Sequence, residues 1–110
     1  MSSYDDRQKG FERKFAHDEE MQFKATARRN KLLGLWAADK LGKSGPDAEQ
    51  YSKDVVMADF ESSGHDDVIQ KLLTDFTEAN LPMSATDIRR EMERLTPIAQ
   101  QMVLEESKSA

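Results

Sequence analysis

The chain of 110 residues contains no cysteine, which excludes disulfide bonds, thiolate metal sites and thiol catalysis. It also lacks any apolar run close to the roughly 18 residues that suggest a membrane span. Its first ten residues, MSSYDDRQKG, carry charges where a signal peptide has an apolar stretch. We therefore expect a cytoplasmic protein that does not insert into a membrane.

Recognisable catalytic and cofactor motifs are missing too. The chain has no H-E-x-x-H and neither of the glycine-rich phosphate-binding patterns. Its two histidines, His17 and His65, have no partners that the sequence can place. The run from His17 to Glu20 consists of consecutive residues, which point in different directions on a helix and cannot converge on one metal ion. We predict no metal, no cofactor and no enzymatic activity, and the alternative use of His17 is as a pH sensor.

Charge is abundant but divides unevenly along the chain. The net charge is -5. Residues 1–31 carry eight Lys and Arg against six Asp and Glu, whereas residues 32–110 carry eight against fifteen. A mildly basic N-terminal segment therefore precedes an acidic body.

The longest regular pattern covers Phe11–Leu41, which has no proline and one internal glycine, Gly34. At about 100° per residue its apolar side chains, Phe23 among them, share one broad arc, which predicts a single long helix. From Leu32 to Ala38 the residues are apolar or small on every face, so we expect this half to be buried, with Trp36 in the core. Before Phe23 the arc is interrupted by polar residues.

Three shorter helices are predicted after the glycine-rich segment that follows Leu41. Each is preceded by Ser-x-x-Asp, in which the hydroxyl can cap free N–H groups and the Asp favours the positive helix end. The three pairs are Ser44/Asp47, Ser63/Asp66 and Ser84/Asp87. The predicted helices span about Asp47–Glu61, a stretch ending at Asn80-Leu81-Pro82, and about Ala85–Glu106, with a kink or break at Pro97.

The sequence therefore predicts an all-α fold, a four-helix bundle with one long N-terminal helix. We expect a flexible N-terminal arm at residues 1–18 and the bundle domain at residues 19–110. The core candidates in the last two helices follow i, i+3, i+4 spacing and are Val68, Ile69, Leu72, Leu73, Phe76, Ala79, Ile88, Met92, Leu95, Ile98, Ala99 and Met102.

Two groups are candidates for partner binding. Arg28 to Lys31 (RRNK) resembles a nucleic-acid patch, but the acidic body favours a solvated outer face. Phe11 and Phe15 lie one helical turn apart among charged residues. They either cover the end of the bundle or serve as anchors of an amphipathic helix that docks in a groove.

The stretch Asp5–Gly42, DDRQKGFERKFAHDEEMQFKATARRNKLLGLWAADKLG, resembles the zeta subunit of alphaproteobacterial ATP synthases. The similarity continues more loosely through YSKDVVMADFESSGHDDVIQKLLTDF and IRREME. Gly10 departs from the family pattern, in which alanine is more common. Glycine in place of alanine costs a helix about 1 kcal/mol.

The resemblance implies a four-helix inhibitor of ATP hydrolysis that inserts its N-terminal segment, about Met1 to Glu19, into a catalytic interface of the rotary head. The implied partner is the catalytic head of the F-type ATP synthase, with its alpha, beta and gamma subunits. The predicted contact residues are Tyr4, Arg7, Phe11, Arg13, Lys14 and Phe15. The alternative function is a small helical module that binds nucleic acid through Arg28–Lys31.

Overall fold

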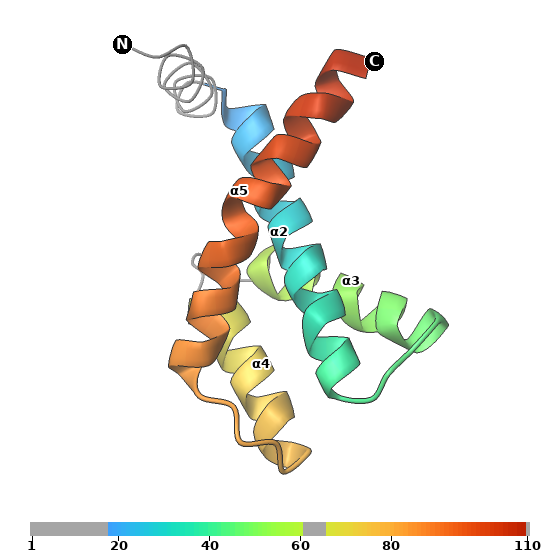
Figure 1. Cartoon of the computed structure of the whole chain (residues 1–110), viewed down its shortest axis with the longest axis vertical. Coiled ribbons are helices and arrows are strands. Elements are labelled where there is room, and N and C mark those ends of the chain that lie inside the picture. Colours follow the sequence, from blue (N-terminus) through green and yellow to red (C-terminus); the bar gives the residue numbers. More distant parts are fainter. Residues whose placement is uncertain (1–17, 61–65, 110) are drawn as a thin grey trace.

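A computed structural model of the chain describes residues 18–60 and 66–109. Within these ranges the protein is all-α, with helices α2 (Glu19–Lys40), α3 (Pro46–Phe60), α4 (Asp66–Glu78) and α5 (Ala85–Ser109) and no strand. α2 packs on α3 and α5, and α4 packs on the same two helices. α2 and α5 are the long elements, and α2 begins where α5 ends, at the same end of the molecule (Figure 1). The predicted fold class is confirmed.

α2 begins later than the sequence pattern predicts. Asp18 has an extended backbone, with φ -115° and ψ 97°, and its carboxylate accepts a hydrogen bond from the Met21 N–H at 3.0 Å. Glu19 and Glu20 fill the first turn, where negative charge is favourable. The prediction of one unbroken helix from Phe11 is therefore wrong at Asp18. Residues 11–17 lie outside the described part of the chain.

The other helix boundaries follow local backbone signals. α2 ends just before Gly42, whose φ of 78° lies in the left-handed region that glycine adopts without strain. α3 begins at Pro46 rather than Asp47, and its first acceptor is the Gly45 carbonyl, which receives the Glu49 N–H at 3.1 Å. α4 is followed by Asn80, also left-handed at φ 59°. These ends fall within one residue or two of the predicted positions.

α5 passes through Pro97 without interruption, so the predicted break is wrong. Proline removes the N–H that would bond to the Glu93 carbonyl. Pro97 and Glu93 are both exposed, so water can satisfy that carbonyl. In the preceding residue, the Thr96 hydroxyl donates to the Met92 carbonyl at 2.9 Å.

The main core lies where all four helices meet. Its largest fully buried side chains are Phe76, Leu33, Leu72, Ile88, Val55 and Val68. Most of the predicted core residues of α4 and α5 are buried, but Ala79 and Ile98 are exposed and Leu73 and Met102 are half-buried. Trp36 is half-buried and packs edge-on against Phe76, with ring centroids 5.8 Å apart. The tryptophan thus covers the edge of the main core and does not occupy its centre.

Gly34 sets the distance between α2 and α3. A Cβ atom at this position would lie 2.7 Å from Ser52 Cα and 3.2 Å from Val55 Cβ. Such a contact is too short, so the two backbones can approach this closely only with glycine here. Gly34 lowers the helix propensity of α2, but the close packing of α2 on α3 requires it.

Candidate partner-binding site

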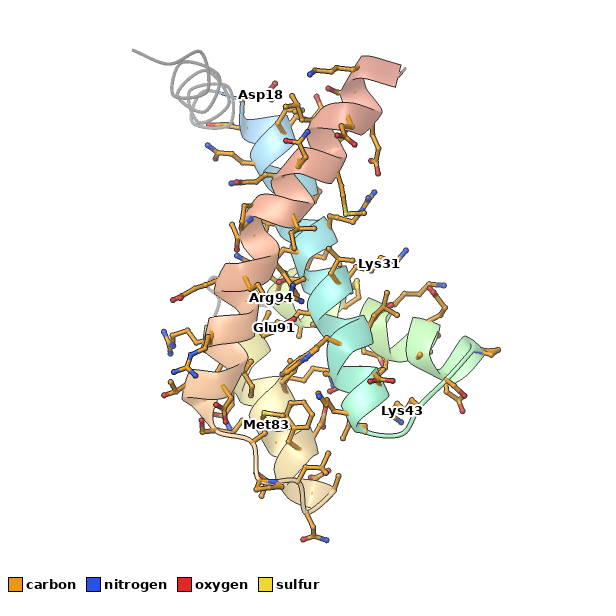
Figure 2. The ribbon with its side chains drawn as sticks, in the orientation of Figure 1. Asp18, Lys31, Lys43, Met83, Glu91 and Arg94 are labelled. Atoms are coloured by element: carbon orange, nitrogen blue, oxygen red, sulfur yellow. The ribbon has the colours of Figure 1, made fainter. Side chains whose placement is uncertain are left out.

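The residues predicted to contact a partner precede α2. Tyr4, Arg7, Phe11, Arg13, Lys14 and Phe15 all lie outside the described residues, as does His17. What the structure describes is the surface next to this segment, where α2 begins. That surface is the end of the molecule at which Asp18 caps α2 and α5 terminates (Figure 2).

A second, separate core holds this end together. Met21 and Ala25 of α2 are buried against Val103 and Leu104 of α5, each at most 8% exposed. We call these four residues the satellite core. The sequence pattern pointed to neither Met21 nor the pair Val103 and Leu104 as core residues.

An ion pair between α2 and α5 lies next to the satellite core. The Arg28 guanidinium donates two hydrogen bonds to the Glu106 carboxylate, at 2.5 and 3.0 Å. The hydrogen bonds from Arg28 lower the pKa of Glu106 below its usual range. The arrangement is bidentate, which fixes the geometry of the two side chains. Because both side chains are partly exposed, this pair orients the helix ends more than it stabilises the fold.

The RRNK run does not form one surface. Arg28 is half-buried and Lys31 is exposed, but Arg29 is only 7% exposed and Asn30 is fully buried. The prediction of a solvated outer face is therefore wrong for the two middle residues. A nucleic-acid patch needs its basic side chains together on the surface, so the structure does not support this alternative.

Arg29 and Asn30 form a buried polar contact. Nε and Nη2 of Arg29 donate to Asn30 Oδ1 at 3.3 and 3.1 Å. Burial lowers the pKa of Arg29, and the nearby carboxylate of Asp59 acts in the opposite direction. The buried Asn30 Nδ2 has no hydrogen-bond partner within the part of the chain described.

An open groove lies beside the satellite core. It has a volume of about 480 Å³. We call it the Phe23 groove; it is lined by Phe23, Lys24, Ala27, Arg28, Lys31, Val56, Val103 and Glu106. A smaller cavity of about 20 Å³ adjoins it on the side of Phe60 and is lined in part by Asn30 and Asp59.

Phe23 lies on the apolar arc of the predicted long helix, but its side chain is exposed. It is 57% exposed and contacts the exposed ring of Phe60 on α3, with centroids 5.2 Å apart. The helical period alone does not determine its exposure, because α2 contacts both α3 and α5.

Other kinds of site are not found in the described ranges. No helix there is long and apolar enough to cross a membrane. No group of three or more metal-ligating side chains converges among residues 18–60 and 66–109. The candidate site is a surface formed by the start of α2, the satellite core and the Phe23 groove.

Comparison with known proteins gives a family and a solved structure. The family model described as ATPase inhibitor subunit zeta matches residues 1–102. A structure solved by NMR in solution is 46% identical, with a TM-score of 0.69 over 78% of this chain and 98% of that chain. No curated protein matches.

Proposed function

Since the chain belongs to the ATPase inhibitor subunit zeta family, we propose that it inhibits ATP hydrolysis by inserting the segment before α2 into a catalytic interface of the F-type ATP synthase head. The interface is formed by alpha, beta and gamma subunits, and the chain acts in the cytoplasm. It acts by binding and performs no chemistry of its own. The family match carries this proposal, because it includes the N-terminal segment as well as the helices.

The charge and aromatic patterns support the insertion. Residues 1–17 combine Phe11 and Phe15, at i, i+4 spacing, with four Lys and Arg and three Asp and Glu. A segment that orders only on binding loses affinity to ordering entropy, but it can enter a groove that a preformed bundle cannot. In this proposal the phenylalanines are the anchors, and Tyr4, Arg7, Arg13 and Lys14 contact the rim.

The four described helices support separate roles for the N-terminal segment, which inserts, and for the bundle, which does not. Asp18 caps the start of α2, so the helix does not depend on the preceding residues for its first turn. The satellite core then fixes α2 to α5 immediately after this cap. The bundle would remain outside the head and limit how far the segment enters.

The test removes the segment without disturbing the bundle. Deletion of residues 1–17, or the double change Phe11→Ala and Phe15→Ala, should abolish inhibition of ATP hydrolysis by the isolated catalytic head. Anchors of this kind cost about 2 kcal/mol or more each on truncation, roughly thirtyfold in affinity. Circular dichroism should give the melting transition of the parent chain. Full inhibition by the folded deletion variant would contradict the proposal.

Gly10→Ala tests the same proposal in the opposite direction. If the segment binds as a helix through Gly10, alanine should strengthen inhibition by up to about 1 kcal/mol. Arg90→Ala is a suitable control, because Arg90 is exposed on α5 and lies outside the segment. It should leave inhibition unchanged.

A further inference from the structure

Two of the exposed large apolar side chains among the described residues, Phe23 and Phe60, lie at the Phe23 groove and the cavity that adjoins it. Phe23, Met57 and Phe60 are 57%, 51% and 50% exposed, and the two phenylalanine rings touch. Exposed apolar residues scattered singly need no explanation, but a cluster beside a hollow is typical of an interaction surface. Only Ile98, 41% exposed on α5, is a further exposed large hydrophobic residue among those described.

The Phe23 groove combines an apolar lining with basic side chains. Ala27, Val56 and Val103 contribute apolar atoms, while Lys24, Arg28 and Lys31 contribute positive charge. The only acidic residue of the lining is Glu106, which is paired with Arg28. Lys24 contacts Glu20 at 3.1 Å, but both side chains are more than half exposed, so this pair is weak and easily exchanged.

The groove is thus a positive region on an acidic molecule. Residues 32–110 carry fifteen acidic and eight basic side chains. An apolar occupant of this groove should therefore carry acidic groups along its edge.

We propose that the Phe23 groove is a second docking surface, which binds an acidic amphipathic helix of the partner protein. An apolar ridge on that helix would pack on Phe23, Phe60 and Val56, and its carboxylates would pair with Lys24 and Lys31. This inference rests on the proposed function, which supplies the catalytic head as the partner. It adds a contact made by the folded helices to the contact made by the N-terminal segment.

Charge argues against two other occupants. The segment of residues 1–17 carries one more basic than acidic side chain, so it does not complement a basic rim. A second copy of the chain, docked by two-fold symmetry, would bring the same basic rim against itself. An acidic partner helix complements the basic rim and brings no like charges together.

The first experiment measures the affinity of the full-length chain for the isolated catalytic head. Phe23→Ala with Phe60→Ala should weaken binding at least about thirtyfold, as expected for anchor residues. Lys24→Glu with Lys31→Glu should weaken it about tenfold at low salt and less at high salt. The matched control is Lys40→Glu with Arg90→Glu, which reverses two exposed charges elsewhere and should have little effect. An unchanged melting transition confirms that each variant keeps the fold.

The second experiment uses the absence of cysteine. Lys31→Cys places one thiol on the rim of the groove, and Arg90→Cys, which removes the same charge, places one on α5 outside the groove lining (Figure 2 labels Lys31). Excess catalytic head should slow maleimide labelling of the Lys31→Cys variant at least about tenfold and leave labelling of the Arg90→Cys variant unchanged. In the free chain, labelling of the groove thiol should depend neither on protein concentration nor on Phe11→Ala with Phe15→Ala.

The outcomes separate the two proposals. If the chain binds the head but the groove thiol stays reactive and the groove variants bind normally, the groove proposal is overturned and the proposed function stands. If the chain does not bind the head at all, both are overturned. Labelling of the free chain that falls with protein concentration would identify a second copy as the occupant. Labelling that rises when Phe11 and Phe15 are replaced would identify the N-terminal segment, and either result overturns the acidic partner helix.

Discussion

Gly34 has a role that its residue type alone does not suggest. In an exposed helix position, replacing glycine by alanine would stabilise the helix by about 1 kcal/mol. Here the new methyl group would lie 2.7 Å from a backbone atom of α3, which can move only if the whole helix shifts. Gly34→Ala should therefore destabilise the protein, whereas the same change at an exposed helix position would stabilise it.

We expect Gly34→Ala to lower the free energy of unfolding by about 1–2 kcal/mol, because overpacking against a backbone outweighs the gain in helix propensity. Chemical denaturation measures this directly. Lys31→Ala is the control on the same helix, since its exposed side chain should change stability by less than about 0.5 kcal/mol. A more stable Gly34→Ala variant would show that α2 and α3 can separate without loss.

Tyr51 is held by two neighbours on α4. Its hydroxyl donates to Asp75 Oδ2 at 2.6 Å, and Lys71 contacts both the same oxygen, at 3.1 Å, and the face of the tyrosine ring. Burial, followed by the hydrogen bond to Asp75, raises the pKa of Tyr51 above its ordinary value. The folded state thus holds the phenol proton more tightly than the unfolded state.

A raised pKa gives a definite sign to the pH dependence. The contribution of Tyr51 is fully present below about pH 10, the ordinary pKa of tyrosine, and is lost as the pH rises above it. Tyr51→Phe should cost about 1 kcal/mol at pH 7, and the difference from the parent chain should shrink above about pH 10. Urea denaturation at about pH 7, 9 and 11 measures both quantities, and a constant difference would contradict this account.

At the scale of the helix, the start of α5 is stabilised by a reciprocal cap. The Ser84 N–H donates to Asp87 Oδ2 at 3.0 Å, and the Asp87 N–H donates to Ser84 Oγ at 3.1 Å. The hydrogen bond from the Ser84 backbone lowers the pKa of Asp87. This cap is confirmed as predicted, whereas Ser63 lies outside the described residues.

Ser84→Ala should lower the free energy of unfolding by about 1 kcal/mol, the usual cost of removing an N-cap hydroxyl. Ser84→Asn should recover most of this loss, because asparagine also accepts a hydrogen bond from the first turn. Thermal denaturation of the three proteins gives the comparison. Equal stability of the alanine and serine forms would mean that water replaces the cap.

The helices and the buried faces of α4 and α5 were predictable from local signals, and the buried face of α2 was not. Caps and left-handed residues such as Gly42 and Asn80 act within a few residues, so the sequence reveals them. Which side of α2 is buried depends on two neighbouring helices that the sequence does not position. This is why Arg29 and Asn30 were predicted to be exposed. The cap at Asp18 could have been found, because two acidic residues follow it directly.

At the scale of the molecule, two cores of unequal size share α2 and α5. The main core draws on all four helices, whereas the satellite core has only four buried residues. Small clusters with few buried contacts open at lower free energy than the whole protein unfolds. The end of the bundle that carries the N-terminal segment should therefore open by itself.

Amide hydrogen exchange tests this directly. Amides of residues 22–28 and 100–106 should exchange faster than those of residues 33–38, whose protection should approach the global free energy of unfolding. Met21→Ala should accelerate exchange at the first two groups and leave the third nearly unchanged. Uniform acceleration would mean that the two cores unfold as one unit.

The position of the two long helices also has a mechanical consequence. Because α2 begins and α5 ends at the same end of the molecule (Figure 1), a force that pulls these ends apart acts across the contacts one after another. Such a load separates α2 and α5 one contact after another. A load applied at opposite ends of the two helices would instead strain all their contacts at once. The pair Arg28–Glu106 and the satellite core would yield first, at low force, and the main core afterwards. Stretched between its ends, the molecule should lengthen in two steps, the first of them reversible.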